Sequence, residues 1–145
     1  MTRVLPKVIE KEVIMLYRCE IDTQYPSAEI TSLISEKIAE SGVETGLGVI
    51  FLPYADAAAA ITTAGKPEVF EDIFEDLNTM IPARTDYRYK ENFCKAAAHT
   101  KSALLGVSCD FIISGGAPEL GENQGFFILD FVAPRKLEFF IKVKA

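Results

Sequence analysis

The stretch FFILDF, residues 126–131, decides the fold, because its apolar side chains occupy both faces of a predicted strand, with Asp130 as the one charge. A strand of this kind needs cover on both sides, from a packed sheet, a helix or another subunit. Residues 137–143 instead alternate largely between apolar and polar side chains, the pattern of a strand with one wetter face. Together the two segments predict layered, mainly antiparallel sheets.

Further strands are expected earlier in the chain. Residues 13–21 are rich in β-branched and aromatic types, which favours a strand. Residues 47–52 are apolar on both faces and bounded by a glycine and a proline, so they predict a buried strand, and a second apolar stretch, 57–61, follows. Residues 109–114 are another strand candidate.

Three helices are expected between these strands. Ser27 is placed to cap the first, whose apolar residues recur at helical spacing, and Gly42 to stop it. The second begins at Pro67 and combines an apolar stripe with an acidic outer face. The third covers 93–105, a run of mainly good helix formers that ends at a glycine. The sequence therefore predicts a single α+β domain over residues 1–145, with mainly antiparallel, sandwich-like sheets and three helices.

Composition limits the partners of the chain. Its 145 residues are 49% hydrophobic, enough for one full core, and a net charge of −6 opposes binding to nucleic acid. No apolar run reaches the roughly 20 residues of a membrane helix, and the first residues lack the apolar block of a signal peptide. Three widely spaced cysteines fit buried, reduced thiols better than a disulfide framework or a zinc site. We expect a cytoplasmic protein with no nucleic-acid or membrane partner.

His99 is the only histidine of the chain, in the middle of the predicted third helix and beside small alanines. Imidazole titrates near neutrality and is the commonest metal ligand in proteins, so a single copy limits the available chemistry. Schemes that need two histidines are excluded within one chain.

Two features remain open when the residues are considered alone. The segment GGAPELGENQG, residues 115–125, predicts a tight loop, whose backbone amides either form an ordinary turn or hold an anion. Asp56 is a lone charge in an otherwise apolar stretch, so it is either exposed in a turn or held by a polar partner inside a site. Of these two environments for Asp56 we expect the turn.

Several segments share one register with a known family. They are the helix that begins with IT at 30–31 and ends with SG at 41–42, TGLGVIFLP at 45–53, KPEVFED at 66–72, AHTKSALLG at 98–106, LGENQG at 120–125 and DFVAPRK at 130–136. In their order and spacing they resemble the secondary thiamine-phosphate synthase family, also called YjbQ-like. The resemblance implies a YjbQ-like fold, a homotrimer, and an enzyme that joins a pyrimidine pyrophosphate to a thiazole phosphate.

The chain differs from this family at the residues that the resemblance implies for the catalytic site. Of three family histidines only His99 is matched, and Tyr54 and Tyr89 occupy the positions of the other two. A histidine triad can hold a divalent metal that organises a pyrophosphate leaving group or an attacking water. Neutral phenols are weak metal ligands, so the substitutions predict a changed or lost metal site.

The resemblance also supplies candidate site residues. The catalytic candidates are His99, Asp72 and Asp130, and the ligand-binding candidates are Tyr54, Asp56, Tyr89, Gly121, Gln124 and Arg135. Asp72 or Asp130 would orient the imidazole, and Arg135 would pair with phosphate through two hydrogen bonds. Each of these residues also has an ordinary structural interpretation: a packed helix histidine, a helix-surface acid, a strand acid bonded to backbone amides, or a surface ion-pair partner.

Two functions are compatible with these residues. In the first, the scaffold retains a pocket for a small phosphate-bearing molecule, while its metal-dependent activity is lost or altered and no cofactor is bound. The alternative is an active thiamine-phosphate synthase-type transferase with a divalent metal at His99. Tyrosine keeps the planar bulk and hydrogen bonding of histidine without its basicity, which favours the first. The apolar strand at 126–131 is a further reason to expect a homotrimer.

Overall fold

The computed structural model describes residues 14–24 and 27–145. In this part of the chain the strands are β1 (Ile14–Thr23), β2 (Ser27–Glu29), β3 (Gly46–Phe51), β4 (Ala57–Thr63), β5 (Ser108–Ser114), β6 (Ala117–Pro118), β7 (Gln124–Asp130) and β8 (Arg135–Lys144). The helices are α1 (Thr31–Ser41), α2 (Pro67–Met80) and α3 (Phe93–Leu105). None of these helices is long and apolar enough to cross a membrane.

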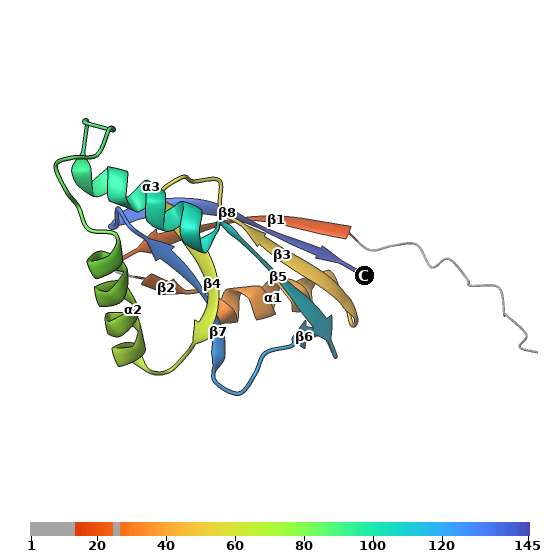
Figure 1. The fold of residues 1–145 in the computed structure, drawn as a ribbon. Coiled ribbons are helices and arrows are strands. Elements are labelled where there is room, and N and C mark those ends of the chain that lie inside the picture. Colours follow the sequence, from red (N-terminus) through yellow and green to blue (C-terminus); the bar gives the residue numbers. More distant parts are fainter. Residues whose placement is uncertain (1–13, 25–26) are drawn as a thin grey trace, which may run out of the picture.

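The strands form two antiparallel sheets (Figure 1). The larger sheet has the order β1-β8-β3-β5-β6, and the smaller one has the order β2-β7-β4. Every strand pairing between described residues is antiparallel, and α1, α2 and α3 pack around the sheets. The predicted α+β class, with antiparallel sheets and three helices, is confirmed.

β7 is buried on both faces, as its sequence predicts. Phe126 and Ile128 belong to the main core, which the large sheet and α1 enclose. On the opposite face Phe127 and Leu129 pack in a second cluster with α2, where the ring centroids of Phe127 and Phe70 are 4.3 Å apart. Because α2 supplies the second cover within the chain, this strand gives no reason to expect a partner subunit.

The start of α1 differs from the prediction. Ser27 does not cap this helix, because it pairs with Leu129 in the short strand β2. Ile30 occupies the N-cap position, and its backbone N–H donates to the Phe126 carbonyl at 2.8 Å. The Thr31 hydroxyl accepts a hydrogen bond from the backbone N–H of Phe126 at 2.9 Å. Strand pairing thus moves the start of the helix past the predicted cap.

β3 was predicted to be buried on both faces, and this is wrong. Leu47, Val49 and Phe51 are 59%, 41% and 44% exposed. Ile50 and Gly48 face the core, and the Phe111 ring covers Gly48 so closely that a Cβ there would overlap it. The outer face of the large sheet has no second layer among the described residues, and an apolar run cannot show which side of a sheet is covered.

A buried ion network joins the two sheets. Arg135, at the start of β8, donates from Nε and Nη2 to Asp130, at the end of β7, over 3.0 and 2.8 Å. Its Nη2 also donates to Asp56, just before β4, at 2.6 Å. The Thr23 hydroxyl at the end of β1 and the backbone N–H of Val132 donate to Asp130 at 2.6 and 3.1 Å. The network therefore holds the ends of four strands in one place.

The charges in this network are balanced mainly by one another. Asp130 is fully buried and Asp56 is 7% exposed. Burial by itself would lower the pKa of the Arg135 guanidinium, but its hydrogen bonds to Asp130 and Asp56 outweigh that effect and raise the pKa above its ordinary value. Arg135 remains charged throughout the pH range of folding, so its removal leaves two carboxylates without a counter-ion.

We expect Arg135→Met to lower the free energy of unfolding by about 3–5 kcal/mol at pH 7, because breaking a buried ion pair leaves an uncompensated charge. Urea unfolding of both proteins at pH 7 measures this loss.

Arg18→Met is the matched control for this substitution, because Arg18 is exposed, and its guanidinium carbon lies over the Phe140 ring, 5.3 Å from the ring centroid. It should cost no more than about 1 kcal/mol. Equal losses in the two variants would contradict a structural role for the network.

Candidate functional site

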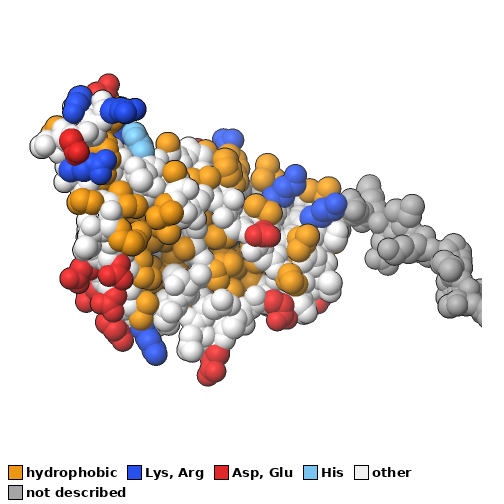
Figure 2. All heavy atoms as spheres, in the orientation of Figure 1, with side chains coloured by type: hydrophobic (Ala, Val, Ile, Leu, Met, Phe, Trp, Pro, Cys, Tyr) orange, Lys and Arg blue, Asp and Glu red, His pale blue; other side chains and the backbone are white. Residues whose placement is uncertain are grey.

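His99 lies at the middle of α3, between two hollows. One, of about 360 Å³, is lined by Tyr54, Ser102 and Gly106 among others. The other, of about 440 Å³, lies under the loop that precedes α3 and is lined by Arg88 and further polar residues. Figure 2 shows the histidine next to a group of Lys and Arg side chains at this end of the molecule. His99 therefore belongs to both hollows.

The sequence of α3 explains how the imidazole is positioned. Ala96, Ala97 and Ala98 are buried, and side chains this small allow α3 to pack closely on β4. Ser102, one turn after His99, donates from its hydroxyl to the Ala57 carbonyl of β4 at 2.6 Å. Asn92 caps the start of the helix, and its side chain accepts a hydrogen bond from the backbone N–H of Lys95 at 3.1 Å. These contacts fix the rotation of α3 and leave His99 partly exposed.

Tyr89 packs edge-on against His99. The ring centroids are 5.2 Å apart with an interplanar angle of 67°. Its hydroxyl donates to Glu91 at 2.8 Å, and this hydrogen bond is the main cause of a raised pKa for Tyr89. The phenol therefore stays protonated near neutrality, and its oxygen is bonded to a carboxylate.

Tyr54 connects the hollow at His99 with the ion network. It lines the hollow, and the Arg135 guanidinium carbon lies 5.1 Å from the centre of its ring. The Tyr54 oxygen accepts a hydrogen bond from the backbone N–H of Glu138 at 2.9 Å. The network thus holds one wall of the hollow through cation–π contact.

This set of donors does not fit a divalent metal. Both phenol oxygens are engaged elsewhere, that of Tyr54 by a backbone amide and that of Tyr89 by a carboxylate. In the part of the chain that the structure describes, no three His, Cys, Asp or Glu side chains are grouped so that they could hold a metal ion. A single imidazole is left, which is too few ligands for the three that a catalytic zinc site uses.

The structure gives Arg135, Asp56 and Asp130 a structural place. Arg135 donates from Nε and Nη2 to two carboxylates, so these N–H groups are committed within the fold, and its pairing with phosphate stays a prediction. Asp56 is buried and held by Arg135, so the expected exposed turn is wrong and the alternative, a polar partner, is found. Asp130 bonds Arg135, Thr23 and a backbone amide, and no hydrogen bond between described residues joins it to His99.

The remaining predicted residues lie away from His99. Asp72 is exposed on α2, and no ion pair or hydrogen bond of the described chain joins it to the imidazole. Gln124 accepts from the backbone N–H of Gly121 at 2.8 Å, and this bond closes part of the predicted loop. That loop precedes β7, at the end opposite Asp130 (Figure 1). With seven residues in β7, the two ends are about 20 Å apart.

Several polar residues of the larger hollow are not among those predicted from the sequence. Arg84, Arg88 and Thr100 line it together with His99. Arg84 is paired with Asp86 at 2.8 Å, whereas no ion pair within the described residues engages Arg88. The repeated basic and aromatic residues of RTDYRY, 84–89, just before the α3 cap, are the signal that would have found them.

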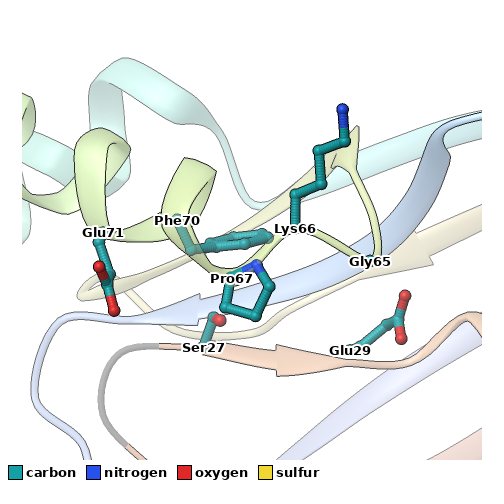
Figure 3. A pocket seen from close by; sticks show the side chains of 7 residues that line it. All are labelled: Ser27, Glu29, Gly65, Lys66, Pro67, Phe70 and Glu71. Atoms are coloured by element: carbon teal, nitrogen blue, oxygen red, sulfur yellow. The ribbon is translucent and has the colours of Figure 1, made fainter.

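A third hollow, of about 360 Å³, lies at the start of α2 (Figure 3). Pro67 and Phe70 form its apolar wall, while Ser27 and Glu29 line it from β2. The Lys66 side chain points away from Glu29 (Figure 3). None of the residues predicted for the site lines this hollow.

Similar sequences come from archaea and bacteria. The chain is 36% identical to UPF0047 protein MJ1081 of Methanocaldococcus jannaschii over 131 residues, which cover 89% of this chain and 94% of that one. It is 28% identical to UPF0047 protein YugU of Bacillus subtilis over 116 residues, which cover 79% of this chain and 86% of that one.

Solved structures agree with this relationship. A YjbQ/UPF0047 protein of Clostridium acetobutylicum superposes with a TM-score of 0.83 at 32% identity, covering 88% of this chain and 98% of that one. A protein of Sulfolobus solfataricus has a TM-score of 0.87 at 18% identity over 93% of this chain and 99% of that one, which shows a shared fold. The family described as UPF0047 protein YjbQ-like matches residues 17–145, and the chain belongs to this YjbQ/UPF0047 family.

Proposed function

We propose that this YjbQ/UPF0047 protein binds a small phosphate-bearing molecule in the hollow at His99, without a metal ion, and that the metal-dependent synthase activity implied by the resemblance is lost or altered. The observation that carries the proposal is that the phenol oxygens of both tyrosines are already hydrogen-bonded to other groups of the chain. Tyr54 and Tyr89 flank the imidazole but direct their oxygens to other partners. His99 then acts as a hydrogen-bonding or proton-exchanging group rather than as a metal ligand.

The charges around the hollow favour an anion. The chain as a whole carries a net charge of −6, yet the larger of the two hollows at His99 is lined by Arg84 and Arg88 against one carboxylate, that of Asp86. A guanidinium presents a planar fork of N–H donors that matches phosphate oxygens, and Arg88 is in no ion pair among the described residues. Thr100, one residue after His99, adds a hydroxyl to the same wall. These donors suit a phosphate group better than a cation or an apolar ligand.

The apolar hollow on the other side of His99 suits the rest of such a molecule. Its lining includes the Tyr54 ring and small aliphatic residues, among them Ala55, Ala103 and Val107. A planar organic group can stack on an aromatic ring there, while its phosphate reaches the arginines. The proposed ligand therefore combines a phosphate with a compact apolar or aromatic part.

The protein purified without added metal should contain much less than one zinc or other divalent ion per chain, because the phenols around His99 bind metals weakly when protonated. Elemental analysis after dialysis measures this. Stoichiometric, tightly bound metal that disappears in His99→Ala would contradict the proposal.

Such a result would favour the alternative synthase-type transferase. That alternative has its own readout, the growth of a thiamine-requiring strain that lacks its synthase. Rescue by the wild-type chain but not by His99→Ala would support the transferase.

We expect inorganic pyrophosphate, used as a probe, to bind saturably to the metal-free protein. Arg88→Gln should weaken its binding about tenfold or more, equivalent to about 1.4 kcal/mol, because one charge-assisted contact is lost. Isothermal titration calorimetry measures the affinity. Lys66→Gln removes the same charge at the start of α2, outside the hollow, and should leave the affinity unchanged.

Absence of saturable binding by the wild-type chain would contradict the proposal. So would an equal loss of affinity in the Arg88 and Lys66 variants, because it would indicate only a general effect of net charge.

A further inference from the structure

The segment between α2 and α3, residues 82–91, is held in shape by its own side chains, and we call it the α2–α3 loop. Its internal contacts join Tyr87 to Pro82, Lys90 to Thr85, Arg84 to Asp86 and to Tyr87, and Tyr89 to Glu91. Surface loops that are packed by their own side chains in this way are compact units and are frequently functional.

One ring contact ties this loop to a helix. Among the hydrogen bonds, ion pairs and ring contacts of the described residues, only the edge-on packing of Tyr89 on His99 joins the loop to a helix or strand, with ring centroids 5.2 Å apart. The loop residues are exposed, apart from the half-buried Tyr87. Segments with few buried contacts open at a low cost in free energy. The loop can therefore leave α3 without disturbing a core.

Both ends of the α2–α3 loop are fixed by hydrogen bonds of the flanking helices. The backbone N–H of Ile81 donates to the Leu77 carbonyl at 2.8 Å at the end of α2. Asn92 caps the start of α3. Hinges of moving segments lie at a few such element-terminal residues, which absorb the backbone rotation. The loop thus has a hinge position at each end, and its internal contacts need not break when it moves.

The hollow of about 440 Å³ at His99 lies between this loop and α3. The loop supplies Arg84 and Arg88 to the lining, and α3 supplies His99 and Thr100. Figure 1 shows the loop at the end of the molecule, beyond the start of α3. A phosphate held by the Arg88 guanidinium and by the imidazole would therefore bond the loop and the helix at the same time.

We propose that the α2–α3 loop is a lid, which opens and closes over this hollow as one unit and is latched by the contact of Tyr89 with His99. The structure holds the lid closed. Opening gives a ligand access to the imidazole, and an anion bound to both Arg88 and His99 shifts the population towards the closed lid. The effect of the anion rests on the proposed function, whereas the latch depends only on residues of the chain.

Fluorine NMR of the ligand-free chain labelled with 3-fluorotyrosine tests the lid. Tyr87 and Tyr89 lie on the loop, and Tyr17, which packs against the main core, is the internal control. Each resonance is assigned by replacing that tyrosine with phenylalanine. Relaxation dispersion should show exchange on the microsecond-to-millisecond timescale, with the same rate constant at Tyr87 and Tyr89 and no exchange at Tyr17.

Substitutions at the latch are observed through Tyr87, whose hydrogen bond and cation–π contact lie within the loop. Tyr89→Ala removes the ring and should raise the ratio of open to closed lid about twofold to tenfold, as expected for the loss of one aromatic pair. Tyr89→Phe is the matched control, because it keeps the ring, and it should leave this ratio unchanged. His99→Ala should act as Tyr89→Ala does, and the double variant should open no further than either single variant.

Different rate constants at Tyr87 and Tyr89, or no exchange at either, would overturn the proposal. So would a Tyr87 resonance that is the same in Tyr89→Ala as in the wild type, or a Tyr89→Phe chain that opens as readily as Tyr89→Ala. Circular dichroism should show that every variant is folded. These measurements use no ligand, so they decide the lid even if calorimetry finds no binding of pyrophosphate, a result that would contradict the proposed function alone. Pyrophosphate that binds should lower the ratio of open to closed lid, and binding that leaves the ratio unchanged would also overturn the lid.

Discussion

The interaction on which the rest of the structure depends is the buried pairing of Arg135 with Asp130. It joins the end of β7 in the smaller sheet to the start of β8 in the larger one. Thr23, at the end of β1, and Asp56, just before β4, bond to the same pair. The same guanidinium packs on the ring of Tyr54, which forms a wall of the hollow at His99. Charge pairing inside the fold thus positions one side of the candidate site.

The sequence predicts the parts of the fold that local pattern controls. The two-sided apolar run of β7 and the boundaries of α3 at 93 and 105 are found as predicted, because burial and helix stops leave local signals. The capping role of Ser27 and the double burial of β3 are wrong, because each depends on which strand or layer lies alongside. Asp56 and Arg135 are 79 residues apart, so their pairing leaves no local signal in the sequence.

The candidate site follows the same division. That His99 lies in the middle of a helix could be predicted, and so could its isolation from other histidines. Which residues share its hollows could not be predicted, because Arg88 and Tyr54 come from segments before α3 and before β4. The structure places the predicted residues in the hollows at His99, in an internal ion network and in the loop 115–125, with Asp72 apart from them on α2.

The most direct test of the account uses the fact that His99 is the only histidine. Its imidazole gives one Cε1–H resonance, which a two-dimensional NMR spectrum of the metal-free protein resolves without assignment. The account predicts that inorganic pyrophosphate shifts this resonance saturably, less effectively in Arg88→Gln, and that equimolar zinc leaves it in place. A stoichiometric response to zinc together with no response to pyrophosphate would contradict the account.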